Sequence, residues 1–206
     1  MSGDSIAPNR LVHDGLQTGL TTMVPRLSVF MAISLDGFIA DESGGVDWLN
    51  TLSPPGDPEE DLGYAALIRS VDALVMGRST LDMVLGFGKW PYGELPIRCL
   101  TNRPPPQALP PEANIIFESG SPAELMERWH SQGLTHIYLD GGRVVQDFLR
   151  ADLIADMNLT QVPALLGKGI PLFVDPFPIK DWHHEAPTVY DNGFVQRRLK
   201  RKRAGE

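Results

Sequence analysis

Two short glycine-containing segments are the parts of this sequence whose residue types and spacing could do chemistry. They are Met76-Gly77-Arg78-Ser79-Thr80 and Asp140-Gly141-Gly142-Arg143-Val144, and each follows a short apolar run. If the apolar run is a strand and a helix follows, the first amide groups of that helix are free and the helix dipole attracts an anion to them. Glycine allows a phosphate to approach the backbone, and arginine binds phosphate through charge-assisted hydrogen bonds. The two segments therefore predict a ligand that carries phosphate groups, although neither matches the GxGxxG or P-loop pattern.

The elements that position these segments alternate between predicted strands and predicted helices. Strands are expected at residues 27–33, 38–40, 73–76, 97–100, 115–117, 137–139 and 157–162. Helices are expected at residues 59–70, after Gly77, between Ser121 and Gly133, and from Gly142 through Leu149. This order is typical of an α/β fold with a mostly parallel central sheet and helices on its faces. Near the carboxyl terminus, Asp191-Asn192-Gly193 separates two strand-like runs and predicts a hairpin, and thus an antiparallel C-terminal edge.

Length and composition restrict the class of protein. With 206 residues, 42% hydrophobic and 21% charged, the chain is expected to fold as one globular domain. It has no apolar run of about 18 residues and no signal-peptide pattern, so a cytoplasmic protein without a membrane span is expected. Its single cysteine, Cys99, excludes an internal disulfide and a cysteine-based zinc site and is predicted to be a core residue. Because neighbouring histidines in a strand point to opposite sides, His183 and His184 do not predict a metal site.

Charge and polarity suggest the limits of the domain. Residues 1–22 are polar and aperiodic and are predicted to be a disordered extension, the folded domain is expected at residues 23–198, and residues 199–206 form a basic tail. The net charge is −8, but residues 197–206 carry +5, so the rest of the chain carries −13. An acidic body argues against a nucleic-acid-binding platform. The basic run is either a last strand that ends in solvent or, less expected, a tether for nucleic acid or anionic lipid.

Four sequence blocks, in order, resemble the dihydrofolate reductase superfamily. They are residues 31–40 (MAISLDGFIA), 74–80 (LVMGRST), 138–149 (YLDGGRVVQDFL) and 163–173 (PALLGKGIPLF), and the similarity covers about residues 27–198. The branch that the blocks resemble is that of the riboflavin-biosynthesis reductase domains. The resemblance implies a dihydrofolate-reductase-like three-layer fold and NADPH as the cofactor.

The resemblance also implies which residues contact the cofactor. Ala32 and Ile39 would hold the nicotinamide through their backbone, and Gly44 and Gly45 would belong to a mobile loop over it. The residues expected at the phosphates and at the adenosine ribose are Gly77, Arg78, Ser79, Thr80, Thr101, Asn102, Arg103, Gly141, Gly142, Arg143 and Val144. An arginine beside a hydroxyl suits the 2′-phosphate of NADP better than the ribose of NAD. The alternative for Arg78 and Arg103 is a surface salt bridge.

A substrate acid is less clearly indicated. By alignment with folate reductases, Asp61 falls at their pocket carboxylate and Thr160 at the threonine that hydrogen-bonds to it. A half-buried Asp61 could orient an amide-like ring or assist its protonation; alternatively, it is one more acidic residue in the first turns of a helix. Trp48 is predicted either to line the pocket or to be an ordinary core aromatic residue.

These observations lead to one expected function and two rivals. We expect an NADPH-dependent reductase that transfers a hydride to a small pteridine-like or ribosylaminopyrimidine-like heterocycle. We expect it to be a stand-alone reductase, because the sequence shows no amino-terminal deaminase zinc motif. The first rival is a module that binds NADPH without turnover, and the second is a nucleic-acid binder tethered by its tail. A homodimer is expected, since relatives in this branch are commonly dimers and the carboxyl-terminal third carries Leu165, Leu166, Leu172 and Phe173.

Overall fold

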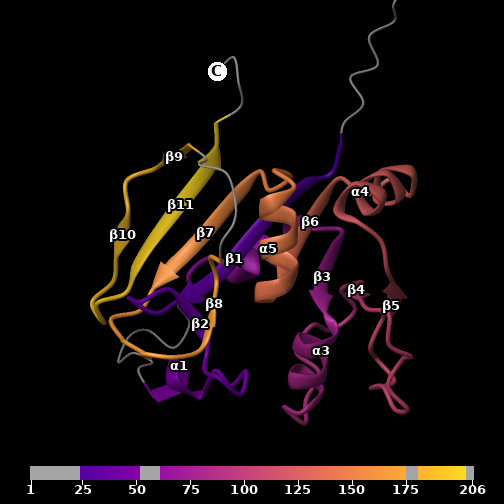
Figure 1. Cartoon of the computed structure of the whole chain (residues 1–206), viewed down its shortest axis with the longest axis horizontal. Coiled ribbons are helices and arrows are strands. Elements are labelled where there is room, and N and C mark those ends of the chain that lie inside the picture. The colour runs from indigo at the N-terminus through magenta and orange to yellow at the C-terminus, as the bar shows by residue number, and fades with distance from the viewer. Residues whose placement is uncertain (1–23, 52–60, 175–180, 203–206) are drawn as a thin grey trace, which may run out of the picture.

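Strands and helices alternate along most of the chain, as the apolar runs predict. The computed structural model describes residues 24–51, 61–174 and 181–202 (Figure 1). The strands are β1 (Arg26–Ile33), β2 (Phe38–Ala40), β3 (Ala73–Gly77), β4 (Ile97–Leu100), β5 (Ile115–Glu118), β6 (His136–Asp140), β7 (Asp156–Gln161), β8 (Ile170–Pro171), β9 (Trp182–His184), β10 (Thr188–Val189) and β11 (Val195–Arg201). The helices are α1 (Asp47–Thr51), α2 (Tyr64–Ser70), α3 (Arg78–Leu85), α4 (Pro122–Ser131) and α5 (Gly142–Arg150). None of these helices is long and apolar enough to cross a membrane.

The strands form one large sheet in the order β10-β11-β7-β1-β6-β3-β4-β5, with β9 paired to β11 (Figure 1). From β7 to β5 all neighbouring strands run parallel. Strand β11 is antiparallel to β7, β9 and β10. Strands β2 and β8 form a separate two-stranded sheet. The predicted α/β fold, a mostly parallel sheet with an antiparallel C-terminal edge, is confirmed.

Two apolar clusters lie on opposite faces of this sheet because successive side chains of a strand point to opposite sides. Within β3, Val75 belongs to the cluster that includes residues of α4 and α5, whereas Leu74 and Met76 belong to the one that includes residues of α3. Trp129 of α4 and Phe148 of α5 stack at a centroid distance of 5.6 Å. Helices therefore cover both faces, and the predicted three layers are present.

The carboxyl-terminal edge agrees with its sequence signal and extends further than expected. Gly193 has a positive φ of 83°, as the hairpin between β10 and β11 requires. Strand β11 runs to Arg201, so residues 199–201 belong to the sheet although they were predicted to lie in the tail. Arg201 pairs with Asp152, Lys200 with Glu185 and Lys202 with Asp181. Acidic partners within the same chain thus already neutralise three of the basic residues that could have formed a tether.

Two local predictions are wrong. Helix α2 begins at Tyr64 rather than at residue 59, because Leu62 and Gly63 both have positive φ values, 56° and 93°, and form a turn. The short helix α1, in the segment after β2, is not among the predicted helices. The predictions for residues 1–22, for residues 59–60 of the first predicted helix and for the end of the tail lie outside the described residues. Cys99 is fully buried, as predicted.

Candidate active site

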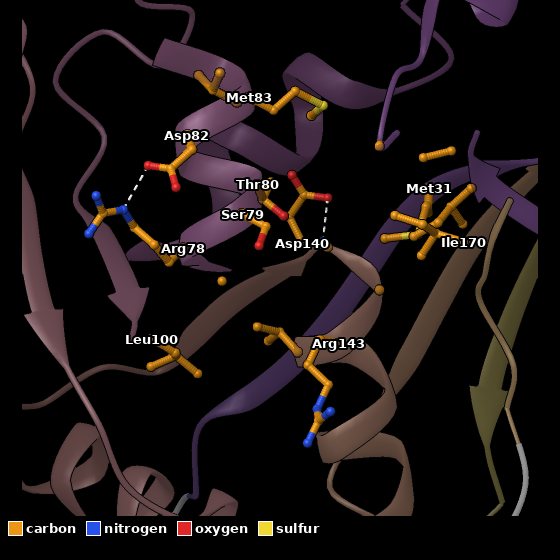
Figure 2. Close-up of a pocket in the computed structure, with 18 of the residues that line it drawn as sticks. Met31, Arg78, Ser79, Thr80, Asp82, Met83, Leu100, Asp140, Arg143 and Ile170 are labelled. Atoms are coloured by element: carbon orange, nitrogen blue, oxygen red, sulfur yellow. Dashed lines mark hydrogen bonds and ion pairs between the residues drawn. The ribbon is translucent and has the colours of Figure 1, made fainter. Parts of the chain in front are cut away.

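One cavity of about 1170 Å³ opens where β1, β3, β4 and β6 reach their carboxyl ends. Every residue predicted to contact the cofactor, except Arg103, lines this cavity. Loops and helix starts that are far apart in the sequence therefore meet at one edge of the parallel sheet, which is where α/β folds place their ligands. Figure 2 shows Arg78, Ser79, Thr80 and Asp140 close together in this cavity.

Helices α3, α4 and α5 all begin at the cavity, and two of them, α3 and α5, have no side-chain cap. Their N-cap residues are Gly77 and Gly141, and neither start has a hydrogen bond from a capping side chain. Helix α4, by contrast, has a complete capping box between Ser121 and Glu124. Helix starts need partners for their first amide groups, and an anion can serve as one. The chain therefore satisfies the start of α4 internally and leaves the starts of α3 and α5 available to phosphate groups.

Close contacts explain why glycine stands at the second junction. Gly141 has a φ of 86°, and a Cβ atom built on it would collide with Oγ1 of Thr80 on α3. A Cβ atom on Gly142 would lie 2.9 Å from Cδ1 of Ile39. The starts of α3 and α5 and strand β2 are thus packed together at the cavity, and a side chain at either glycine would disturb this packing. The donor set, the free amides and this cradle fit a nucleotide cofactor with phosphate groups.

Each of the two helices also carries an arginine that pairs with an aspartate four residues later. Nε of Arg78 donates to Oδ1 of Asp82 at 2.7 Å, and Oδ2 of Asp82 accepts from Nη2 of Arg103 at 3.3 Å. On α5, Arg143 and Arg150 both donate to Asp147, at 2.9 and 3.0 Å. Arg103 does not line the cavity, but Asp82, which does, connects it to Arg78. The alternative weighed for Arg78 and Arg103, a salt bridge, is therefore present within the cavity wall.

The loop between β2 and α1 closes another side of the cavity. Asp41 holds a turn in this loop, since its Oδ1 accepts hydrogen bonds from the amides of Ser43 and Gly45 at 2.8 Å. Gly44 and Gly45 line the cavity, as do Val46 and Leu49. This places the predicted covering loop beside Ile39 and Ala32.

The structure reveals one acid in the cavity that sequence reasoning treated only as part of a glycine turn. Asp140 is the last residue of β6, it lines the cavity, and its Oδ1 accepts a hydrogen bond from the amide of Gly141 at 2.8 Å. Burial raises the pKa of Asp140 to about 6 against the lowering effect of that hydrogen bond. Its charge also contributes to the raised pKa values of Tyr64 and Tyr92, although burial is the larger cause for both. A signal was available, because the end of a buried parallel strand is where polar residues meet a ligand.

The three residues predicted to be catalytic do not line this cavity. Asp61 is exposed rather than half-buried, and its carboxylate accepts hydrogen bonds from the amides of Gly63 and Ala65. Thr160 is buried in β7, and its Oγ1 lies 3.3 Å from Nε2 of Gln196. Because Gln196 also donates to the carbonyl oxygen of Leu62, it stands where a direct contact between Thr160 and an acid was expected. Trp48 is half-buried in α1, and its Nε1 has no hydrogen-bond partner within the described ranges.

Among the described residues, no group of three histidine, cysteine, aspartate or glutamate side chains could hold a metal ion. His183 and His184 are both exposed in β9.

Known proteins resemble the chain over most of its length. The family model described as RibD C-terminal domain matches residues 25–195. The uncharacterized protein YwjB of Bacillus subtilis (strain 168) is 31% identical over 147 residues, which are 70% of this chain and 80% of YwjB. The crystal structure of a putative riboflavin biosynthesis protein from Shewanella sp. PV-4 has a TM-score of 0.79 and 37% identity, and the match covers 86% of this chain and 99% of that one. Dihydrofolate reductase from Enterococcus faecalis, complexed with NADP(H), shares the fold at a TM-score of 0.54 and 18% identity, over 86% of this chain and 97% of that one.

Proposed function

Because the chain belongs to the RibD C-terminal domain family, we propose that it is an NADPH-dependent reductase of a small, flat heterocycle. The observation that carries the proposal is that one cavity collects two uncapped helix starts and a half-buried acid with a raised pKa. Uncapped helix starts suit the phosphates of a nucleotide, and an acid whose pKa is near neutrality suits proton transfer. A reductase that takes a hydride from a nucleotide cofactor and a proton from a side chain would use both features.

The cofactor would extend along the carboxyl ends of β1, β6, β3 and β4. We propose that Ala32 and Ile39 hold the nicotinamide, that Gly44 and Gly45 cover it, and that the starts of α3 and α5 bind the phosphates. Thr101, Asn102 and Arg103 would bind the adenosine end, with Arg78 and Arg103 on a 2′-phosphate. When bound, NADPH supplies the hydride that the substrate carbon accepts.

Asp140 would bind and protonate the substrate. At a pKa of about 6 it still holds a proton in part of the molecules near neutral pH, so it can donate one to a ring nitrogen while the adjacent carbon is reduced. Tyr92 lines the same cavity, and Tyr64 packs against Phe30 and Tyr138 with ring centroids 5.7 and 6.3 Å apart. The two rings that line the cavity, Phe30 and Tyr92, together with the Asp140 carboxyl group suit a flat heterocycle with a polar edge.

The substrate class that we propose is a pteridine-like or ribosylaminopyrimidine-like compound. Support comes from the family and from the riboflavin-biosynthesis description of the similar Shewanella protein. Asp61, Thr160 and Trp48 remain predictions and are not needed for this mechanism, since none of them lines the cavity.

The test is oxidation of NADPH in the presence of a panel of pterins and ribosylaminopyrimidines. We expect at least one compound to be reduced by the wild-type protein, and Asp140→Asn to lower kcat by about a hundredfold while NADPH still binds. Asp147→Asn is the matched control, because it removes an equal charge from the same cavity wall. If NADPH binds and no compound is reduced, the alternative, a cofactor-binding module without turnover, is correct.

We also propose that the protein is a homodimer. Leu165, Phe173 and Val189 in the carboxyl-terminal third are 73%, 40% and 69% exposed, whereas Leu172, expected on the same surface, is buried in the core. Light scattering that gives the 22.7 kDa of one chain at micromolar concentration would contradict a dimer.

A further inference from the structure

We propose that Asp82 controls how strongly the cavity prefers a nucleotide that carries an additional phosphate over one that does not. Asp82 holds two arginines in ion pairs, and these ion pairs compete with that phosphate. The inference rests on the proposed function, because it assumes that the cavity binds a nucleotide cofactor. It concerns a residue outside the predicted cofactor set, and it predicts a gain of affinity when that residue is changed.

The position of Asp82 makes this competition possible. Asp82 lies one helical turn after Arg78 and lines the cavity, and its two carboxylate oxygens accept from two guanidinium groups on different segments. The Arg78 side chain is 15% exposed, and that of Arg103, in the loop after β4, is 58% exposed. The carboxylate thus links the start of α3 to the adjacent loop at the cavity wall. Figure 2 shows its contact with Arg78.

These ion pairs occupy the donors that a phosphate would use. Arg78 donates from Nε to Asp82 and from Nη1 to the carbonyl oxygen of Pro104. A guanidinium binds phosphate best through two parallel N–H groups. The Nε edge of Arg78 becomes available for such a contact only when Asp82 releases it.

The charge of Asp82 acts in the same direction. Two arginines and one aspartate give this cluster a net charge of +1, and removal of the carboxylate raises it to +2. A phosphate that carries close to two negative charges would meet the Asp82 carboxylate at short range, and like charges at such distances repel each other. An uncharged ribose hydroxyl would not experience this repulsion. Asp82 therefore disfavours the phosphorylated nucleotide selectively.

Helix α5 provides a matched control. Asp147 pairs with Arg143 and Arg150, lines the same cavity and is 39% exposed, compared with 42% for Asp82. Both of its arginines lie on its own helix, and the Arg143 side chain is 84% exposed. Asp147→Asn therefore makes the same change in total charge but leaves Arg78 and Arg103 bound to Asp82.

The experiment is a titration of wild type, Asp82→Asn and Asp147→Asn with NADPH and NADH by nicotinamide fluorescence. Adenosine 2′,5′-bisphosphate and adenosine 5′-phosphate are titrated in parallel by calorimetry. In Asp82→Asn we expect the affinity for each 2′-phosphorylated compound to rise about threefold to tenfold relative to its partner compound. The gain should shrink at high salt, because screening weakens interactions between exposed charges. In Asp147→Asn, the ratio of the affinity for the 2′-phosphorylated compound to that for its partner compound should change less than twofold.

Three outcomes would overturn the inference. In the first, the ratio falls in Asp82→Asn, so that Asp82 only positions the arginines. In the second, the ratio is unchanged. In the third, both variants raise it equally, which is a general charge effect. A gain of affinity cannot come from damaged folding, and thermal melting of each variant checks this point.

If wild type binds none of the four nucleotides, both the inference and the proposed function fail. If the nucleotides bind with the expected affinity ratios but no compound is reduced, only the proposed reductase activity is refuted.

Discussion

The junctions β3–α3 and β6–α5 lie side by side in the sheet and begin alike. Met76 and Asp140 are register partners in the parallel pair β3–β6. Each junction passes through glycine into an uncapped helix with an arginine near its start and an aspartate four residues later. On sequence alone, the two junctions predict the same kind of phosphate contact.

Their tertiary surroundings make them different. Arg78 is 15% exposed and linked through Asp82 to a second loop, whereas Arg143 is 84% exposed and pairs within its own helix. Figure 2 shows the Arg143 side chain pointing away from Arg78 and Asp82. In the strands, a buried Met76 stands opposite the acid Asp140. We infer a division of roles, in which α3 supplies the cation cluster and β6–α5 supplies the acid and a close backbone approach.

The largest effect expected from this division is that of Gly141→Ala. The backbone at Gly141 has a φ of 86°, which side chains rarely adopt, and the new Cβ atom would press on Thr80. We expect cofactor affinity to fall by more than about a hundredfold, with a loss of about 1–3 kcal/mol in the free energy of unfolding. Urea unfolding and NADPH titration measure the two effects.

Gly133→Ala is the control for this change. Gly133 follows α4, has a φ of 78°, and has open space where its Cβ atom would lie. It should lose about 1 kcal/mol of stability and no cofactor affinity. Equal affinities for the two variants would show that β6–α5 makes no close approach to the cofactor.

The second prediction concerns Asp140→Asn, which removes the acid found at only one junction. Besides the expected loss of kcat, its stability should depend on pH differently from that of wild type. The folded-state pKa of Asp140 is raised from 3.8 to about 6, so its contribution to stability is present below pH 4 and is lost as the pH rises through 6. Well above that pH, Asp140→Asn should be more stable than wild type by about 3 kcal/mol, and the two should converge below pH 4. A difference in unfolding free energy that does not change with pH would contradict the burial of this charge.

The strands of the sheet and the glycines at the cavity could be predicted because local sequence determines them. The apolar run of β3 predicts a buried strand, and the glycine pair at the start of α5 predicts the turn from a strand into a helix. Similarly, Ser121 and Glu124 form the capping box that their spacing predicts.

The substrate acid could not be located in this way, because its environment comes from distant segments. Asp61 and Asp140 are both aspartates beside a turn. Asp61 is exposed and bonded to local amides, whereas Asp140 is half-buried in the cavity, where its charge acts on Tyr64 of α2 and on Tyr92. The same reason explains Arg78 and Arg143, whose different exposure depends on the loop after β4 and not on their own helices.

The third prediction tests the cation cluster against its counterpart on α5. Arg78→Ala and Arg103→Ala should each weaken NADPH by about tenfold to a hundredfold, because a charge-assisted hydrogen bond contributes about 1.5–3 kcal/mol. NADH, which has no 2′-phosphate, should change far less. Arg143→Ala should weaken NADPH less than about threefold, since its side chain is mostly exposed. Equal loss for both cofactors in the α3 variants, or a large loss in Arg143→Ala, would contradict the division of roles.

The smallest effect is expected at the helix start that the protein caps for itself. Ser121→Ala removes the hydroxyl that accepts from the Glu124 amide and that donates to the Glu124 carboxylate at 2.9 Å. The loss should be about 1 kcal/mol in the free energy of unfolding, and NADPH affinity should stay within about twofold of wild type, because the amides of α4 already have a partner within the chain. Bound NADPH should raise the melting temperature of Ser121→Ala and wild type by the same amount, whereas it should raise that of Gly141→Ala much less. If Ser121→Ala also lost cofactor affinity, the start of α4 would be a third phosphate contact, and the contrast between capped and uncapped helix starts would not separate structural positions from binding positions.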